Sequence, residues 1–276
     1  MDQAALTLEL ERRLVNAWPS FETELAGGWL LRFTRGYSKR ANAATPIVQG
    51  ASLDAELIEA IGASFAARGL PACFRLTGTQ DAAAEGLLDA AGFVSHEPSL
   101  ALTAPLDAVA APDSALDITA RPSAAWCKAA AAAYGGEKAD AEMLARIVSR
   151  IRQKAAFATL RLDGEAAAWG FAVAERGLVG LYDIVVAPDL RGLGLGRRLV
   201  ADLMAWGRQA GAERAYLQMR EANETAFALY TSLGYGIAYR YTHRLRAAER
   251  RTGDRATTGP ASIASRQPPG DEDASA

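Results

Sequence analysis

The sequence predicts an α/β protein in which strands and helices alternate along two halves of the chain. Three observations lead to this prediction. Helical stretches repeat apolar residues at spacings of three and four, short apolar runs end at turn residues, and a stretch rich in Ala, Pro and Asp separates two similar sets of elements. We therefore expect two domains, at residues 1–104 and 115–246, joined by a linker at residues 105–114.

Composition limits the classes of protein that fit. The chain has 276 residues, is 50% hydrophobic and 22% charged, and carries a net charge of −2. This balance is typical of a globular protein and gives no support to general nucleic-acid binding. Cys73 and Cys127 are the only cysteines, so we expect buried thiols and no disulfide framework. With no apolar run of membrane-spanning length and no secretory signal, the sequence predicts a cytoplasmic protein without a membrane partner.

The first half alternates strands with amphipathic helices. We expect Ser52 to cap the second helix, Gly92 to end the third, and Pro98 to place the last strand at an edge or break. In order, the predicted elements are a helix at 4–17, strands at 29–33 and 46–48, a helix from 53 to 65, a strand at 72–76, a helix at 81–91 and a strand at 93–102.

The second half begins with helices and continues with a hairpin. Asp163-Gly164 is a strong turn signal between two apolar runs, and Gly234 is expected to end the last helix. From residue 247 onward apolar content falls sharply, which predicts a disordered tail at 247–276. In order, the predicted elements are a strand at 116–119, helices at 122–134 and 139–151, strands at 155–162, 166–174 and 178–187, a helix at 194–209, a strand at 215–219, a helix at 223–233 and a strand at 237–245.

A glycine-rich segment in the second half has the pattern of an anion-binding turn. An apolar run from Leu178 leads to Gly192, Gly194 and Gly196, and a helical pattern follows. A strand, a glycine loop and a helix N-terminus bring backbone N–H groups together, and the helix dipole favours negative charge there. The segment matches neither the dinucleotide pattern G-x-G-x-x-G nor the end of a P-loop.

Three arginines surround this turn. Arg197 and Arg198 fall in the first helical turn, where cations oppose the helix dipole, and Arg191 precedes them. A bound polyanion would explain three cations at this place. The alternative is that they are solvated side chains beside a tight turn.

The loop and a second block together resemble one family. Arg191, Gly194 and Gly196 fit the pattern R-x-x-G-x-G. The segment from Asn223 to Tyr235 is similar to N-x-x-A-x-x-L-Y-x-x-x-G-F, with Tyr in place of the usual Phe. Over most of the second half the chain thus resembles the GCN5-related N-acetyltransferases (GNAT). The resemblance implies a mixed, mostly antiparallel central sheet flanked by helices, and acetyl-CoA as co-substrate with no metal.

The resemblance also implies where acetyl-CoA binds. The strand before the loop pairs with the pantetheine arm, and its N–H groups polarise the thioester carbonyl. The loop N–H groups hold the pyrophosphate. The cofactor-binding residues implied are Val185, Val186, Arg191, Gly192, Leu193, Gly194, Leu195, Gly196, Arg197, Asn223 and Tyr230.

The proposed reaction is the attack of an amine on a thioester, so the leaving thiolate needs a proton. A thiol has a pKa of about 8.5 and a tyrosine of about 10, which makes Tyr a suitable acid. The resemblance assigns this role to Tyr230. The alternative for Tyr230 is core packing.

The identity of the base stays open at the level of sequence. Some family members carry Glu where this chain has Gln218, and Gln cannot accept a proton as a base. Asp183 is a charged residue within a predicted strand, where Asp is rare, so it is either a base acting through water or a hydrogen-bonded structural carboxylate. Glu221 is a third candidate, with a solvated surface role as the alternative.

Other notable side chains favour ordinary roles. His96 and His243 have no Cys or acidic cluster at ligand spacing, so no metal site is expected. The basic residues Arg32, Arg35, Lys39 and Arg40 either bind a second anion or form a solvated loop, and the loop is favoured. We expect Trp126, Trp169 and Trp206 in the core and place Trp18 and Trp29 in a substrate cleft as a hypothesis.

A weak internal repeat relates the two halves. The order strand, helix, Gly, aromatic residue, strand occurs around Gly92-Phe93 and again around Gly234-Tyr235. The first half has no G-x-G at the place of the loop, which favours a degenerate copy of the second. Chance similarity of two α/β halves is the alternative.

These observations predict an acetyl-CoA-dependent N-acetyltransferase that acts by direct attack of a primary amine. The acceptor would be a small molecule or a peptide, and the protein a monomer or homodimer that does not bind nucleic acid. The rival hypothesis is a non-catalytic acyl-CoA-binding sensor, which Gln218 keeps open.

Overall fold

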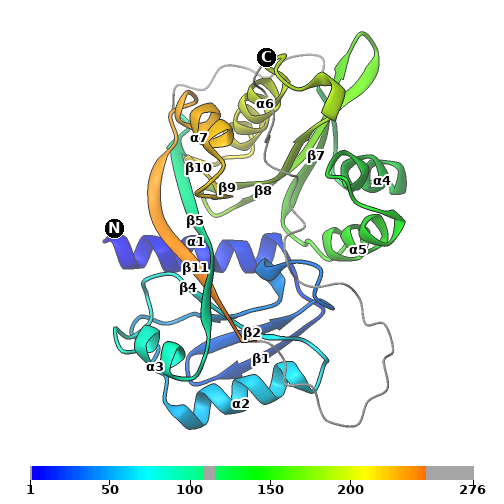
Figure 1. Ribbon diagram of the computed structural model, residues 1–276. Coiled ribbons are helices and arrows are strands. Elements are labelled where there is room, and N and C mark those ends of the chain that lie inside the picture. Colours follow the sequence, from blue (N-terminus) through cyan, green and yellow to red (C-terminus); the bar gives the residue numbers. More distant parts are fainter. Residues whose placement is uncertain (1, 108–115, 247–276) are drawn as a thin grey trace, which may run out of the picture. The chain divides into compact units, whose positions relative to one another are not determined.

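The computed structural model describes residues 2–107 and 116–246 (Figure 1). The predicted tail and most of the predicted linker lie outside the described residues. Contacts divide the chain into two compact units whose boundaries are discontinuous in sequence. Within the described residues, the first unit holds 2–11, 20–98 and 239–246, and the second holds 12–19, 99–107 and 116–238.

The first unit is built on a mixed sheet with the strand order β1-β2-β3-β4-β11. Neighbouring strands are antiparallel except β3 and β4, which are parallel. Helix α1 and strands β5 and β11 each contribute residues to both units. The elements are α1 (Gln3–Ala17), β1 (Glu22–Ala26), β2 (Trp29–Phe33), η1 (Lys39–Ala41), β3 (Ala44–Pro46), α2 (Ala55–Ala66), β4 (Ala72–Leu76), α3 (Ala84–Ala90), β5 (Val94–Pro105) and β11 (Gly236–Arg246).

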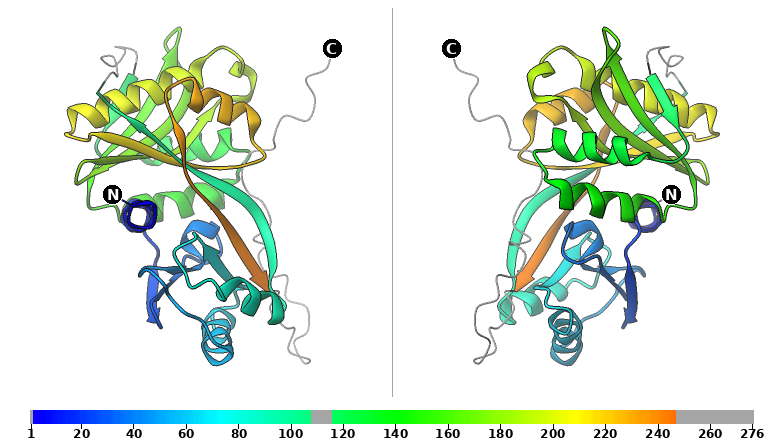
Figure 2. Two further views of the ribbon diagram at one scale, coloured as in Figure 1. Left: turned by 90° about the vertical axis from the view of Figure 1, so that its left-hand side faces the viewer. Right: turned by 90° about the vertical axis from the view of Figure 1, so that its right-hand side faces the viewer.

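The second unit has the strand order β5-β10-β9-β8-β7-β6. Only β9 and β10 are parallel, so the predicted mixed, mostly antiparallel sheet is confirmed here. Figure 2 gives two further views of these elements. They are β6 (Leu116–Thr119), α4 (Ala124–Ala133), α5 (Lys138–Val148), β7 (Lys154–Leu162), β8 (Glu165–Glu175), β9 (Leu178–Val186), η2 (Pro188–Leu190), α6 (Leu195–Gln209), β10 (Arg214–Arg220) and α7 (Glu224–Thr231).

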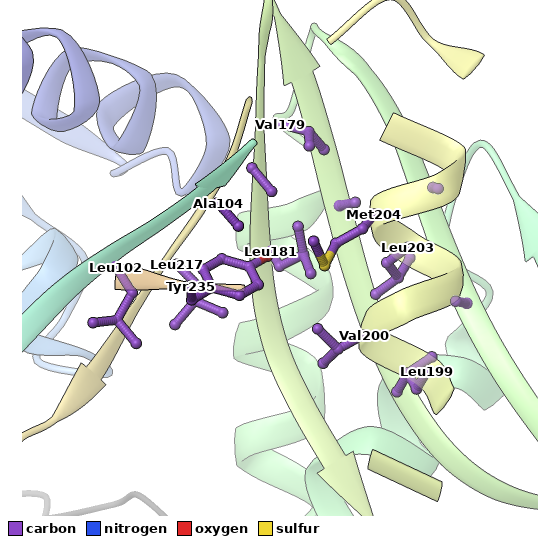
Figure 3. Packing of buried hydrophobic residues seen from close by; sticks show 14 of the residues in the cluster. Leu102, Ala104, Val179, Leu181, Leu199, Val200, Leu203, Met204, Leu217 and Tyr235 are labelled. Atoms are coloured by element: carbon purple, nitrogen blue, oxygen red, sulfur yellow. The ribbon is translucent and has the colours of Figure 1, made fainter. Parts of the chain in front are cut away.

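Helices cover both faces of the second unit's sheet. A Cβ on Gly170 of β8 would touch Leu199 and Leu203 of α6, whereas the next residue, Phe171, contacts Trp126 of α4. Because successive strand residues point to opposite faces, α6 and α4 lie on opposite sides of the sheet. Figure 3 shows the α6 side, where leucines and Val200 of the helix pack against the strands. This packing fixes the N-terminus of α6 at the end of β9.

Most predicted elements are confirmed, and several details of the first half are corrected. The second helix begins at Ala55, and its N-cap is Asp54 rather than Ser52: the Asp54 Oδ1 accepts a hydrogen bond from the Leu57 N–H at 2.7 Å. Strand β3 covers 44–46 instead of 46–48, and α3 starts later than predicted. Strand β1 was not predicted, since its sequence ETELA has the composition of an exposed loop or helix.

Buried tryptophans correct the cleft hypothesis. Trp18 is 2% exposed and stacks on Phe171, and Trp29 is fully buried with its indole N–H donating to the Ser52 carbonyl at 2.9 Å. Both are therefore core residues of their own units. Trp126 and Trp169 are buried as predicted, and both cysteines are buried thiols.

Candidate functional site

Two parallel strands of the second unit, β9 and β10, pair over three residues only and then separate. The register of β9 with β10 runs from Leu178 opposite Arg214 only as far as Gly180 opposite Tyr216. Beyond this point β9 remains paired with β8 on its other side. The later residues of β9 therefore present one edge of backbone N–H and C=O groups toward the opening between the strands.

A buried tyrosine pair lies where the strands part. The hydroxyls of Tyr182 and Tyr216 are 2.6 Å apart and both side chains are buried. Gly180 lies beneath them, and a Cβ there would come within 2.4 Å of the Tyr182 hydroxyl. The missing side chain at Gly180 thus makes room for this pair.

The open part of β9 contains a β-bulge. Trp169 pairs with Val185 and Phe171 with Tyr182, so Gly170 faces two residues, Asp183 and Ile184. Asp183 has φ +48°, a left-handed backbone that Asp tolerates better than most residues. A Cβ on Gly170 would come within 2.6 Å of Ile184 Cδ1. Glycine on the facing strand therefore gives the bulge its space.

Helix α4 contacts the bulge through its last residues. The hydroxyl of Tyr134, the C-cap of α4, donates to the Ile184 carbonyl at 3.2 Å. Burial, and to a lesser degree the Asp183 carboxylate, raises the pKa of the Cys127 thiol of α4 to about 11. Cys127 therefore stays protonated near neutral pH and is unsuited to act as a nucleophile.

The glycine loop connects β9 to α6. Gly192 and Gly194 have φ of +79° and +75°, and a Cβ on either would meet no atom within 4 Å. Their role is conformational, since a side chain there is strained although space is open. Arg191, Gly192, Leu193 and Gly194 are exposed, so the loop is accessible.

Gly196 has a different role from the other two glycines. It lies in the first turn of α6, and a Cβ there would come within 3.3 Å of Leu229 in α7. Gly196 therefore allows α6 to pack closely against α7. The first-turn N–H groups of α6 have no partners within their helix, so they can act as hydrogen-bond donors at the loop.

The arginines at the loop differ in their surroundings. Arg191 and Arg197 are exposed, and Arg198 is half-buried. The Arg197 Nη1 donates to the Ser232 Oγ at 2.5 Å, so this side chain is directed to the end of α7. Because the guanidinium of Arg197 is directed to α7, only the backbone N–H of this residue remains at the N-terminus of α6.

Helix α7 carries the second block. Asn223 is its N-cap, and its Oδ1 accepts from the Ala226 N–H at 3.0 Å, as predicted. Tyr230 is half-buried, with its ring centroid 5.8 Å from that of Tyr235. Since Tyr230 is not enclosed, its hydroxyl is not confined to a core position.

The candidate base Asp183 and the position of Gln218 lie on the two separated strands. Asp183 lies on the bulge of β9, and Gln218 lies on β10 beyond its last residue paired with β9. Both are half-buried. Glu221 follows β10 and is exposed. Asp183 and Gln218 thus lie on the unpaired parts of the two neighbouring strands, β9 and β10.

The fold is that of GCN5-related N-acetyltransferases. A GCN5-related N-acetyltransferase from Kribbella flavida aligns with a TM-score of 0.66 at 19% identity, covering 88% of this chain and 95% of its own. A tandem GNAT protein from the clavulanic acid biosynthesis pathway aligns with a TM-score of 0.57 at 13% identity, covering 88% of both chains. These similarities establish the fold.

Sequence similarity assigns the chain to a particular family. A family model described as "Probable histone acetyltransferase Rv0428c C-terminal" matches residues 7–248, so the chain belongs to this family of N-acetyltransferases. The uncharacterized N-acetyltransferase YobR of Bacillus subtilis is 25% identical over 247 residues, 86% of this chain and 98% of that protein. The [ribosomal protein bS18]-alanine N-acetyltransferase of Escherichia coli is 34% identical over 79 residues, 29% of this chain and 53% of that enzyme.

The described residues 2–107 and 116–246 contain no group of three or more His, Cys, Asp or Glu side chains placed to hold a metal ion. Within the same ranges, no helix has the length and apolarity needed to cross a membrane.

Several site features were not predicted from sequence. The strand separation, the facing Gly170, the Tyr182–Tyr216 pair and the Tyr134 hydrogen bond all depend on pairing between distant segments. Gly170 and Gly180 were the available signals, because an isolated glycine within a strand pattern indicates a bulge or a close approach.

Proposed function

We propose that the protein transfers the acetyl group of acetyl-CoA to a primary amine. The observation that carries this proposal is the opening between β9 and β10, which ends at the exposed glycine loop and the N-terminus of α6. An open strand edge suits the amide groups of pantetheine, and the helix start suits the pyrophosphate.

In this proposal the backbone of β9 aligns the thioester. The Ala187 N–H donates to the Ala167 carbonyl on β8 at 2.9 Å. Because the N–H groups of successive strand residues point to opposite edges, Val186 faces the open edge and Val185 faces β8. Val186 is therefore the stronger of the two predicted backbone partners. The bulge redirects the backbone at Asp183, where an N–H group would stabilise the developing oxyanion.

Side chains would complete the proton transfers. Tyr230 is proposed to donate a proton to the departing thiolate of CoA. Asp183, on the opening, is proposed as the base that deprotonates the amine through water, with a structural role at the bulge as the alternative. Attack by the amine nitrogen forms the C–N bond as the C–S bond breaks, so no acyl-enzyme is required.

The first experiment is isothermal titration with acetyl-CoA, followed by a thiol-release assay over a panel of amines. We expect binding, with thiol release for some amines. Gly194→Val should abolish binding while circular dichroism shows a folded protein, because Val is strained at φ +75°. Unchanged affinity in this variant would exclude the loop as the acetyl-CoA site.

The same assay tests the sensor alternative. Tight binding of acetyl-CoA without release of thiol for any amine in the panel would favour an acyl-CoA-binding sensor. Amine classes for the panel come from relatives: one is named as a [ribosomal protein bS18]-alanine N-acetyltransferase, and another, 41% identical over 58 residues, is named as a 5-NmdU N-acetyltransferase.

We also propose that the chain is a tandem arrangement with a degenerate N-terminal copy, in two domains. The ends of α3 and α7 support this proposal. Phe93 N–H donates to the Leu88 carbonyl at 2.9 Å, and Tyr235 N–H donates to the Tyr230 carbonyl at 3.1 Å. In each case a left-handed glycine precedes the aromatic residue. A cytoplasmic location and a monomeric or homodimeric state remain predictions of the sequence.

A further inference from the structure

One face of the first unit's sheet is unusually polar for a buried layer. Its other face carries aromatic and aliphatic residues that pack under α2 and α3. On the polar face, β2, β3, β4, β11 and the residue directly after β4 contribute side chains that are at most 5% exposed. These side chains are Arg32, Thr45, Arg75, Thr77 and His243.

Arg75 and His243 are direct neighbours on this face. They are opposite each other in the antiparallel register of β4 and β11, which places their Cβ atoms about 5 Å apart. The Arg75 guanidinium stacks on the ring of Tyr241 at 3.6 Å, and the His243 ring lies 5.8 Å from the same ring. The three side chains form one cluster.

Two of the Arg75 nitrogens and the neighbouring Tyr239 hydroxyl have hydrogen-bond partners. Arg75 Nε and Nη2 donate to the two carboxylate oxygens of Glu11 at 2.9 and 2.7 Å, and the Tyr239 hydroxyl donates to the same carboxylate. Burial lowers the pKa of Arg75, but the Glu11 carboxylate more than compensates and raises it above its usual value. Arg75 is therefore charged and held by Glu11.

The remaining polar atoms of the cluster lack hydrogen-bond partners. Within the described residues, Arg75 Nη1 and both ring nitrogens of His243 are buried without one. Leaving such a group unpaired costs about 1–3 kcal/mol, and native structures rarely do so. Three such atoms on neighbouring side chains indicate that a polar ligand binds there.

The charges around His243 indicate that this ligand is an anion. Burial lowers the pKa of His243 well below its usual value, and Arg75, Lys39, His96 and Arg40 lower it further. Lys39, in η1, is paired with Glu97 of β5 at 2.5 Å and also acts on Cys73, a neighbour of Arg75 on the same face. The carboxylates of this region are both paired, Glu11 with Arg75 and Glu97 with Lys39, and Arg40 adds a further cation.

We propose that His243, Arg75 and Lys39 bind an oxyanion, a carboxylate or phosphate group of a small ligand, in the first unit. Arg75 Nη1 and a His243 N–H would donate to it, and Lys39 would exchange Glu97 for it. Of the other basic groups that act on His243, the His96 side chain is 35% exposed and Arg40 is half-buried. The residues of this site are distinct from those of the proposed acetyl-CoA loop, and the site gives Lys39 of the basic segment a role.

The two histidines of the chain make a direct test possible. Full-length protein labelled with 13C in histidine is titrated with inorganic phosphate or acetate, each against sodium chloride at equal ionic strength. His96→Gln assigns the two ring signals. We expect a saturable shift of the His243 signal and a higher His243 pKa with the bound anion. A response to phosphate alone identifies a phosphate ligand, and a response to both identifies a general oxyanion site.

Variants test the contacts. Lys39→Met should weaken the anion affinity about tenfold, or 1.4 kcal/mol. Lys138→Met is the matched control, because Lys138 also pairs with a glutamate but is 91% exposed in the second unit, and it should leave the affinity unchanged. Gly194→Val, which removes the proposed acetyl-CoA site, should also keep the His243 response.

Three results would overturn the proposal. One is a His243 signal that moves no more in phosphate or acetate than in chloride, which would mean that water satisfies these atoms. A second is equal affinity in Lys39→Met and wild type. A third is loss of the response in Gly194→Val, which would mean that the anion acts from the glycine loop.

Discussion

At the scale of single residues, two neighbouring tyrosines of the candidate site, Tyr230 and Tyr235, have hydroxyl groups in different surroundings. Tyr230 is half-buried, whereas its ring neighbour Tyr235 is 3% exposed and its hydroxyl has no hydrogen-bond partner within the described residues. Burial raises the pKa of Tyr235 well above its usual value, so it holds its proton. In the proposed reaction, Tyr230 rather than Tyr235 is therefore the proton donor.

We expect Tyr230→Phe to lower kcat by about 100-fold or more, because the departing thiolate loses its proton donor. The KM for acetyl-CoA should change little, since the loop and strand contacts remain. Steady-state kinetics at several pH values measures both. Tyr235→Phe is the control: it removes a hydroxyl from the same ring pair and should keep full activity. Full activity in Tyr230→Phe would assign Tyr230 to packing.

His243 predicts a pH dependence of stability. Its pKa in the folded protein is lowered, mainly by burial, below the ordinary value of 6.5. The unfolded chain therefore takes up a proton first, and stability falls as the pH drops below about 6.5. The slope due to this residue is at most about 1.4 kcal/mol per pH unit.

Urea unfolding between neutral and mildly acidic pH measures this slope. His243→Asn should flatten the acid side of the stability curve even where it lowers stability overall. An identical slope in the variant would assign the acid sensitivity to other groups.

At the scale of elements, glycines decide which helices pack closely. Gly207 of α6 is buried, and a Cβ there would come within 2.5 Å of Val179 in β9. Gly86 of α3 is exposed, and a Cβ there would meet nothing within 4 Å. The same residue type therefore has opposite consequences in two helices.

Replacing each of these glycines by alanine gives a matched pair. Gly207→Ala should destabilise the protein by about 1–3 kcal/mol through overpacking against β9. Gly86→Ala should stabilise it by about 0.5–1 kcal/mol, because alanine restricts the unfolded chain and fits the helix. Chemical denaturation measures both. Equal effects of the two substitutions would contradict the predicted close approach of α6 to β9.

At the scale of the whole molecule, the compact units do not follow the chain in order. Strand β5 pairs with β10 from Ser99 to Pro105, and Leu100, Leu102 and Ala104 belong to the second unit's core. Trp18, which directly follows α1, stacks on Phe171 in the same unit. The second unit therefore uses residues from outside the predicted domain at 115–246.

This interleaving predicts the behaviour of fragments. Fragment 115–246 should fail to fold cooperatively, because β10 loses its neighbour β5 and the aromatic stack loses Trp18. Fragment 1–246, which lacks only the predicted tail, should keep the melting temperature of the full chain. Circular dichroism and thermal melts distinguish the two. A cooperative melt of 115–246 would support the domain boundaries that the sequence predicts.

Local signals in the sequence determined most elements and the family resemblance. The turn at Asp163-Gly164, the cap at Asn223 and the loop from Arg191 to Gly196 each act within a few residues, so composition and spacing are sufficient to predict them. The sequence predicted Ser52 as the N-cap of the second helix, whereas the structure has Asp54. Both residue types are good caps, and only the local backbone decides between them.

Only the tertiary structure decided the separation of β9 from β10, the bulge at Asp183 and the buried contacts of Arg75. Each depends on which distant segments pair, and the pairing register is set by side-chain packing across the sheet rather than by neighbours in sequence. Burial then changes the chemistry of residues that look ordinary in the sequence. His243, unremarkable in its sequence context, becomes a neutral buried ring among cations only because β11 pairs with β4.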